Sequence, residues 1–188
     1  MIANVPALSE SGFVAGMEAG FLANPPTAWY ALRVKSRFEF VTSAALRQKG
    51  FEQFLPSYRS GRRWSDRIKD LEMPLFPGYV FCRFDLSDLY RALNTAGVLH
   101  VVSAGRIPLP MNDEEILAVQ ALCRSRLQIE PWPLPLVGQR VMIIRGPLAV
   151  MEGQVVEFKN KCRIVVSISL LQRSVAAEID RDWVRPIS

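Results

Sequence analysis

The segment "LEMPLFPGYVF", Leu71–Phe81, combines two prolines and one glycine with large apolar and aromatic side chains. The prolines fix φ at their own positions, and the glycine lets the chain turn where a side chain would obstruct it. Such a segment holds its rings in one orientation, which favours docking because little entropy is lost on binding. The alternative is that Phe76 and Tyr79 are core residues of a strand, since aromatic runs are often buried.

Helical and extended patterns alternate before this segment. "WYALRV" at residues 29–34 alternates and predicts a strand. The following residues place Phe38, Val41 and Ala45 at helical spacing, with Ser36 able to cap the helix and Gly50 able to end it. Residues 51–58 are β-prone, and the basic residues 59–70 resemble the tip of a long hairpin.

Strand and helix patterns also alternate after the segment. Residues 79–84 predict a strand, residues 85–97 a short helix with Ser87 as its cap, and residues 98–103 a further strand. The clearest helix covers residues 111–128. Asn112 is its cap, Glu115 follows three residues later, and one face carries Ile116, Val119, Leu122 and Cys123. The order β-α-β-β-α-β-α predicts an α+β domain over residues 29–128, with helices covering a mostly antiparallel sheet.

Composition shifts mark three further regions. Residues 1–28 are rich in Ala, Gly and Pro with few charges, which predicts a flexible tail. Residues 129–136 hold three prolines and predict a stiff linker. Residues 137–188 contain five short β-branched runs separated by turns, which predict a small β-barrel.

Cysteine and charge patterns exclude several protein classes. The three cysteines are far apart and His100 is the only histidine, so we expect neither a metal site nor a disulfide framework. Residues 1–28 lack the Lys or Arg of a secretory signal, and no apolar run is long enough to span a bilayer, so we expect a cytoplasmic protein with no membrane partner. The net charge of +5 favours an anionic partner.

No catalytic motif is present in the sequence. It lacks a glycine-rich phosphate loop, HExxH and GxSxG, and a strand histidine such as His100 is usually structural. We therefore expect a protein that is not an enzyme and that binds no cofactor.

Three strings in this order resemble the NusG family of transcription elongation factors: "WYALRV", "PLFPGYVF" and "VGQRVMIIRGPLAVMEGQVVEF". The resemblance covers residues 29–187. "WSDR", "PLFPGYVF" and "LLQRSV" are most similar to the specialised UpxY-type antitermination paralogues of long polysaccharide-type operons. The resemblance implies a monomer with a NusG-type N-terminal domain and a C-terminal SH3-like KOW barrel. It also implies that the N-terminal domain docks on the clamp helices of the largest RNA polymerase subunit and suppresses pausing.

The resemblance also assigns residues to sites. The polymerase-docking positions are Trp29, Tyr30, Leu75, Phe76, Pro77 and Tyr79. Nucleic acid, including the non-template DNA strand, is expected to contact Arg62, Arg63, Trp64 and Arg67 on the hairpin, and Lys35, Arg37, Arg47 and Gln48 around the first helix. These basic residues are alternatively solvated surface charges.

In the barrel, the KOW turn is expected at Gly146, Pro147 and Gly153, because positive φ or close backbone approach requires glycine. Val150 stands where the family commonly has glycine, and a β-branched residue resists left-handed angles. The resemblance implies that Leu170, Leu171, Gln172 and Arg173 bind a small-subunit ribosomal protein or Rho. The alternative is that the two leucines pack under the barrel.

Two other functions stay open at this point. The chain resembles a housekeeping NusG factor nearly as well as a specialised paralogue. A ribosome-associated RNA-binding module is the alternative from another class, because KOW barrels also occur in ribosomal proteins. The apolar docking segment is what separates these readings, since rRNA binding does not explain it.

Overall fold

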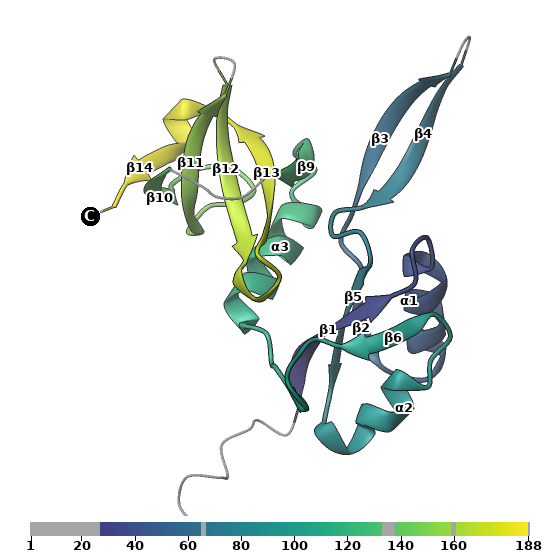
Figure 1. Cartoon of the computed structure of the whole chain (residues 1–188). Coiled ribbons are helices and arrows are strands. Elements are labelled where there is room, and N and C mark those ends of the chain that lie inside the picture. The colour runs from purple at the N-terminus through teal and green to yellow at the C-terminus, as the bar shows by residue number, and fades with distance from the viewer. Residues whose placement is uncertain (1–26, 65–66, 133–137, 159–160, 188) are drawn as a thin grey trace, which may run out of the picture.

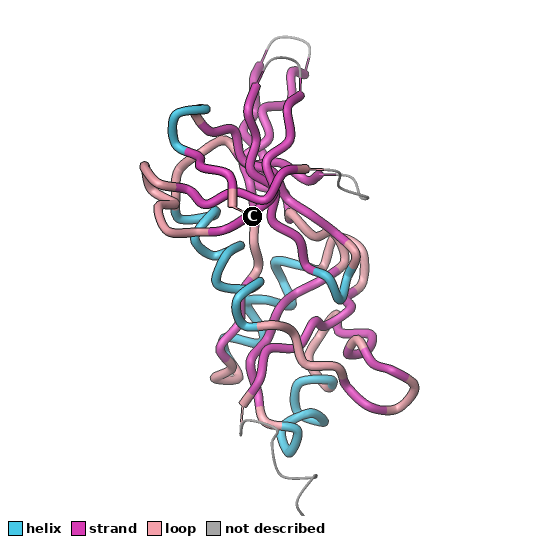
Figure 2. The backbone as a smooth tube through the Cα atoms, turned by 90° about the vertical axis from the view of Figure 1, so that its left-hand side faces the viewer, coloured by secondary structure: helices cyan, strands magenta, loops and turns pink. Residues whose placement is uncertain are grey.

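The computed structural model describes residues 27–64, 67–132, 138–158 and 161–187. Figure 1 shows two main sheets, with helix α3 (Asp113–Arg124) between them and a long hairpin projecting beside the second sheet. Figure 2 shows the same chain from the side, where strands form most of the backbone around the hairpin and the second sheet. The predicted α+β class with mostly antiparallel sheets is confirmed.

The first sheet has the order β2-β5-β1-β6, and all of its pairs are antiparallel. Its strands are β1 (Ala28–Val34), β2 (Glu52–Phe54), β5 (Tyr79–Phe84) and β6 (Val98–Val101). Helices α1 (Glu39–Gln48) and α2 (Leu89–Leu93) cover one face, where Leu46 and Ala92 pack with the strand residues Leu32, Val80 and Cys82. Burial of this alternating face is what fixes the register of the central strands.

The predicted hairpin forms a sheet of its own. Strand β3 (Ser57–Trp64) pairs with β4 (Arg67–Pro74) over its whole length. We predicted one strand over residues 51–58, but the structure divides this segment between β2 and β3. Pro56 has no N–H to continue the β2 ladder, and its carbonyl instead accepts a hydrogen bond from Leu75 N at 2.9 Å. A smaller hairpin joins β7 (Ser103–Ala104) and β8 (Ile107–Pro108).

Helix α3 begins where its cap was predicted. Asn112 Oδ1 accepts a hydrogen bond from Glu114 N at 2.8 Å. The predicted inward face is also confirmed, because Ile116, Val119 and Leu122 are fully buried. Glu115 does not complete a capping box. Its carboxylate instead accepts a hydrogen bond from Ser169 N at 3.2 Å, which connects α3 to the turn at residues 169–171.

The second sheet, called the C-terminal sheet below, has the order β14-β10-β11-β12-β13-β9 and is antiparallel throughout. Its strands are β9 (Ile129–Trp132), β10 (Gln139–Ile143), β11 (Glu152–Phe158), β12 (Lys161–Ile168), β13 (Arg173–Ile179) and β14 (Val184–Pro186). The five predicted strands are present. The sixth, β9, lies in the segment predicted as a linker, and it occupies an edge, where the missing N–H of Pro131 is tolerated.

Short 3₁₀ turns connect the remaining elements: η1 (Leu86–Asp88), η2 (Ser169–Leu171) and η3 (Arg181–Trp183). Before η1 the predicted cap is shifted by two residues. The carboxylate of Asp85 accepts the hydrogen bond from Ser87 N at 2.7 Å, so Asp85 rather than Ser87 is the cap.

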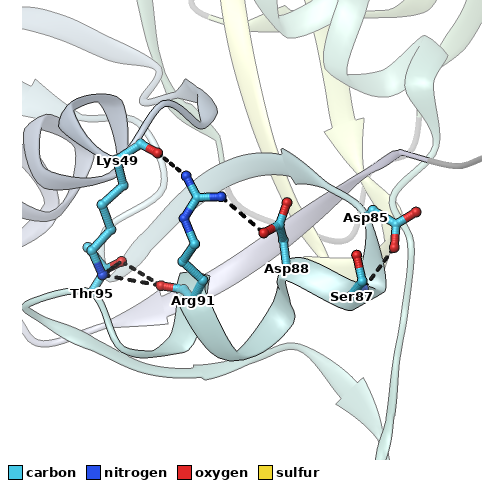
Figure 3. Close-up of polar contacts among 6 residues, drawn as sticks. All are labelled: Lys49, Asp85, Ser87, Asp88, Arg91 and Thr95. Atoms are coloured by element: carbon cyan, nitrogen blue, oxygen red, sulfur yellow. Dashed lines mark hydrogen bonds and ion pairs between the residues drawn. The ribbon is translucent and has the colours of Figure 1, made fainter.

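Helices α1 and α2 are held together by polar contacts at their ends (Figure 3). Lys49 Nζ donates hydrogen bonds to the carbonyl of Arg91 at 3.2 Å, the carbonyl of Asn94 at 2.9 Å and the hydroxyl of Thr95 at 2.9 Å. The guanidinium of Arg91 donates in return to the carbonyl of Lys49 and pairs with Asp88 at 3.0 Å. The last carbonyls of both helices therefore have cationic partners.

The turn between β10 and β11 contains two of the three residues predicted for the KOW turn, Gly146 and Pro147. Gly146 has φ of 82°, and a β-carbon there would lie 2.5 Å from the ring of Trp183. Pro147 is exposed beside it. Gly153 lies within β11 rather than in the turn, and a β-carbon there would come 2.8 Å from Ile164. Val150 adopts φ of 73° in spite of its branched side chain.

Candidate docking surface

Strand β1 separates the two aromatic residues that were predicted to dock together. Trp29 and Ala31 face one side of the first sheet, whereas Tyr30 and Leu32 face the other. Tyr30 is 1% exposed and stacks on Phe84, with ring centroids 4.6 Å apart. Its burial raises the pKa of its hydroxyl, and the charge of Asp85 adds to this shift. The structure therefore does not bring Tyr30 together with Trp29, because adjacent residues of a strand point to opposite faces.

The turn that follows Leu75 is held rigidly. Tyr79 N donates a hydrogen bond to the carbonyl of Phe76 at 3.1 Å, and Gly78 between them has φ of 84°. Gly78 N donates to the buried carboxylate of Glu39 at 2.8 Å. A β-carbon on Gly78 would lie 2.5 Å from the guanidinium of Arg33. Glycine is required here for both its angle and its size.

Two arginines lie over the ring of Tyr79. The Arg33 guanidinium carbon is 4.8 Å from the ring centroid, and that of Arg173 is 5.2 Å away. Arg173 Nη1 also donates a hydrogen bond to the carbonyl of Pro77 at 3.2 Å. Pro77 itself is exposed and Tyr79 is half-buried. These contacts bring a residue from β13 of the C-terminal sheet onto the turn of the first sheet.

The remaining predicted docking residues are covered in this structure. Trp29, Leu75 and Phe76 are between 1% and 5% exposed. They belong to one continuous apolar cluster that also contains buried residues of α3 and of the C-terminal sheet, such as Ile116 and Ile168. Trp29, Leu75 and Phe76 are therefore closed to water in this conformation. Other parts of the chain cover them, and only Pro77 and Tyr79 remain accessible.

The predicted partner-binding loop lies against the same region. Leu170 and Leu171 are half-buried and pack on this apolar cluster, which agrees with the alternative that they are tucked in. Gln172 is exposed and has φ of 49°. The structure thus places the loop that ends at Arg173 beside the turn that contains Pro77.

The predicted nucleic-acid residues fall into two separate groups. Arg62, Arg63, Trp64 and Arg67 lie on the hairpin strands, near the end away from the first sheet, but their side chains lie outside the described part of the structure. Lys35, Arg37, Arg47 and Gln48 are all exposed on α1 and the turn before it. Arg37 has φ of 66°, a left-handed angle that is uncommon for arginine.

Sequence reasoning missed two residues that organise this region, Arg33 and Glu39. Arg33 shares the face of β1 that carries Trp29 and Ala31, so strict alternation could have placed it beside the turn. Glu39 is 5% exposed. A charged residue at the start of a helix is normally assigned to the solvent side, and no sequence signal indicated its contact with Gly78 N.

The thiols of Cys82 and Cys123 are neutral at ordinary pH. Burial raises the pKa of Cys82 to about 12, with a further contribution from the charge of Glu52. Burial also raises the pKa of Cys123 to about 11, against a smaller opposing effect of the Ser57 backbone and Arg124. Across the described ranges, no group of three His, Cys, Asp or Glu side chains is placed to hold a metal ion. None of the described helices has the length and apolarity needed to cross a membrane.

These features define an α+β protein in which an apolar face of one antiparallel sheet, rimmed by Pro77 and Tyr79, is covered by a second sheet. Residues 27–120, half of the chain, match the family described as "Transcription termination factor nusG". The chain belongs to the NusG family, whose members are transcription factors rather than enzymes.

Individual relatives agree with this assignment. The chain is 25% identical over 173 residues to the transcription termination/antitermination protein NusG of Thermus thermophilus, covering 81% of this chain and 94% of that protein. It is 24% identical over 190 residues to the protein of the same name from Borreliella burgdorferi, covering 85% and 98%. Its fold is similar to the solved structure titled "Domain interaction in Thermotoga maritima NusG", with a TM-score of 0.54, 22% identity, and coverage of 86% and 98%.

Proposed function

We propose that this protein controls transcription elongation by docking on RNA polymerase. The docking surface consists of Trp29, Leu75, Phe76, Pro77 and Tyr79, and its partner is the pair of clamp helices of the largest subunit. Bound there, the protein suppresses pausing or termination. The observation that carries this proposal is the rigid turn at Gly78, which presents Pro77 and Tyr79 at the rim of an apolar face that the first sheet does not bury by itself.

Docking on this face requires the C-terminal sheet to move away, because that sheet and α3 now share a core with Trp29 and Phe76. A polymerase helix pair would replace one apolar cover by another. The free energy of this exchange is small compared with that of exposing the face to water, since the apolar area is buried in both states.

A carboxylate placed at the rim tests the docking surface. Pro77→Glu adds a charge to an exposed position next to the apolar face, and the charge would have to be desolvated in the complex. We expect the affinity of the full chain for core polymerase to fall at least tenfold, measured by co-purification and by surface-immobilised binding. The control is Ile107→Glu, which places the same charge on a residue that is 70% exposed on β8. Equal affinity of Pro77→Glu and the unmodified chain would overturn the proposal.

We propose further that the C-terminal sheet is a KOW-type barrel, and that its 170–173 loop binds a small-subunit ribosomal protein or Rho once the two sheets separate. Packing of Leu170 and Leu171 on the shared core supports this, because separation would leave two apolar side chains without cover. Cross-linking at position 172, which is exposed, would identify the bound protein in cells.

We propose that the protein serves specific long biosynthetic operons of the polysaccharide type, as UpxY-type paralogues do. Mapping of its chromosomal positions tests this directly. Occupancy restricted to a few long operons is expected, whereas occupancy of all transcribed genes would identify a housekeeping factor. Co-purification of ribosomal subunits without polymerase would instead identify a ribosome-associated module.

A further inference from the structure

A cavity of about 580 Å³ lies between the base of the β3–β4 hairpin and the connection from α3 to β9. Its lining includes Tyr58, Arg59 and Glu72 from the hairpin, and Arg126, Leu127 and Gln128 from the connection. Figure 1 shows the hairpin beside β9, so the two walls come from segments that are distant in the sequence. The volume is within the range of about 300–1,000 Å³ that small-molecule sites have.

Backbone hydrogen bonds hold both walls of this cavity in place. At the hairpin base, Leu75 N donates to the carbonyl of Pro56 at 2.9 Å. On the other side, Glu178 N of β13 donates to the carbonyl of Gln128 at 3.3 Å, next to the first residue of β9. The cavity is therefore formed without a ligand, and binding requires little further ordering of the chain.

Two arginine side chains give the cavity positive charge. Arg59 and Arg126 are exposed, and within the described part of the chain neither guanidinium forms an ion pair or a hydrogen bond. The carboxylate of Glu72 accepts a hydrogen bond from Ser57 Oγ. Guanidinium groups bind phosphate oxygens through paired, charge-assisted hydrogen bonds. The cavity therefore favours a ligand that carries two anionic groups.

The backbone of Arg126 adds a second observation. Helix α3 ends at Arg124, Ser125 caps it, and Arg126 follows with φ of 60°. Helices most often have glycine at this position, because a β-carbon makes the left-handed angle unfavourable. Local stability thus does not explain an arginine here, whereas contact of its guanidinium with a ligand does.

We propose that this cavity binds a nucleoside diphosphate. Arg59 and Arg126 contact the phosphates, and the base packs against the ring of Tyr58 and the side chain of Leu127, which are both half-buried. The carboxylate of Glu72 accepts hydrogen bonds from the ribose hydroxyls. This carboxylate also disfavours a bare anion such as pyrophosphate, because the like charges repel each other and no hydroxyl offsets the repulsion.

Occupation of the cavity also opposes polymerase docking, a consequence that rests on the proposed function. In the proposed docking movement α3 and the C-terminal sheet leave the first sheet, so the cavity loses the wall that carries Arg126 and Gln128. A ligand that contacts both walls binds the closed arrangement better than the open one. The bound nucleotide should therefore lower the affinity for polymerase.

Calorimetric titration of the full chain without polymerase is the direct test of binding. The probes are ADP, GDP, CDP and UDP, with pyrophosphate and uridine as separate halves of the ligand. We expect at least one nucleoside diphosphate to bind, and both halves to bind more weakly. Arg59→Gln and Arg126→Gln should each weaken this binding about tenfold, because each variant removes a charged partner of a phosphate.

Arg124→Gln is the matched control for these two variants. Arg124 is exposed on α3, and its guanidinium already bonds to the backbone and the side chain of Gln120. Its replacement should leave binding unchanged, whereas general attraction of anions to a basic chain would weaken equally in all three variants. Tyr58→Phe should bind as the unmodified chain does, and Tyr58→Leu, which keeps apolar volume but no ring, should bind more weakly.

Arg126→Gly separates binding from stability. Glycine relieves the unfavourable angle, so the melting temperature of the ligand-free chain should rise by about 2–4 °C. Binding of the nucleotide should fall as it does in Arg126→Gln. A purely structural role of this guanidinium would instead lower the melting temperature, and that result would contradict the proposed contact.

Three results would overturn the inference. They are no binding of any of the four nucleoside diphosphates, unchanged affinity in both Arg59→Gln and Arg126→Gln, or pyrophosphate binding as tightly as the nucleotide. The effect on docking has its own test, which is polymerase affinity with and without saturating nucleotide, and equal affinities would rule that effect out. The titration uses no polymerase, so failure of the proposed docking through Pro77→Glu is distinguishable from failure of the nucleotide site.

Discussion

At the scale of a single residue, Gly78 connects the turn before β5 to helix α1 and to strand β1. Its N–H donates to the carboxylate of Glu39, its carbonyl accepts from Val34 N, and a β-carbon added to it would meet the Arg33 guanidinium. A residue with these contacts determines both the shape of the docking turn and the position at which α1 begins.

Gly78→Ala should therefore be costly. The left-handed angle alone costs about 1–2 kcal/mol for a residue with a β-carbon, and the contact with Arg33 adds to it. We expect a loss of unfolding free energy above that range in urea titration. Gly105→Ala is the matched control, because Gly105 also has positive φ, at 60°, but has no atom within 4 Å of the added carbon. Equal losses in the two variants would show that the Arg33 contact contributes nothing.

Cys82 should make stability depend on pH above 9. Its pKa rises from 9.0 to about 12 on folding, so the folded chain keeps a proton that the unfolded chain loses. Stability from this residue is complete below pH 9 and is lost as the pH rises toward 12, by about 1.4 kcal/mol per pH unit. Urea titrations from about pH 8.5 to about pH 10.5, which cover the first part of this loss, should show a shallower decline in the free energy of unfolding for Cys82→Ala. An identical decline in both proteins would contradict the shift.

At the scale of the elements, helix α2 depends on Lys49, which caps the end of α1. A single ammonium group satisfies two carbonyls and one hydroxyl at the end of this five-residue helix. Figure 3 shows its contacts with Arg91 and Thr95. So short a helix has little stability of its own, and its last carbonyls need partners.

Lys49→Met should destabilise the chain by about 1–2 kcal/mol, because it keeps most of the apolar stem but removes the charged donor. The measurement is thermal and urea unfolding, with hydrogen exchange of the α2 amides as a local probe. Lys35→Met is the matched control, because it removes the same charged group from an exposed side chain. If both variants lose the same free energy, the contacts of Lys49 add nothing to stability.

The elements also show how far sequence reasoning reaches. Helix α3 follows its pattern because its apolar residues are the buried ones and its cap is local. Helix α1 does not, since its polar residues are satisfied by Gly78, Ala96 and Gln53, which are distant in sequence. Strand β9 was missed because prolines argue against a strand unless its edge position is known. On β1 the sequence reasoning grouped Trp29 with Tyr30, which lie on opposite faces, and it did not single out Arg33.

At the scale of the whole molecule, the predicted docking surface and the predicted partner-binding loop contact each other. Arg173, from the predicted partner-binding loop, bonds to Pro77 and lies over Tyr79, both in the predicted docking surface. Ser169, just before this loop, donates a hydrogen bond from its N–H to the carboxylate of Glu115 on α3. In this conformation each region limits access to the other.

Arg173→Ala should weaken this closed arrangement. It removes one hydrogen bond and one cation–π contact, and we expect higher affinity for polymerase because less free energy is needed to separate the sheets. A pair of distance probes on residue 99 of β6 and residue 150 in the turn between β10 and β11, both exposed, should show a larger open population. Arg185→Ala is the control, since Arg185 is an exposed arginine on β14. Lower polymerase affinity in Arg173→Ala would instead place Arg173 among the docking residues.

Because β9 pairs with β13, the chain passes from α3 directly into the C-terminal sheet. Strands β9 and β10 belong to the same sheet, so a separation that keeps this sheet intact has to begin before β9. Any hinge that leaves β9 in place must lie before Ile129, and the hydrogen bond between Glu115 and Ser169 favours a pivot ahead of α3. Inserting residues after β9 would then leave the reach of the C-terminal half unchanged, whereas inserting them after β8 would extend it.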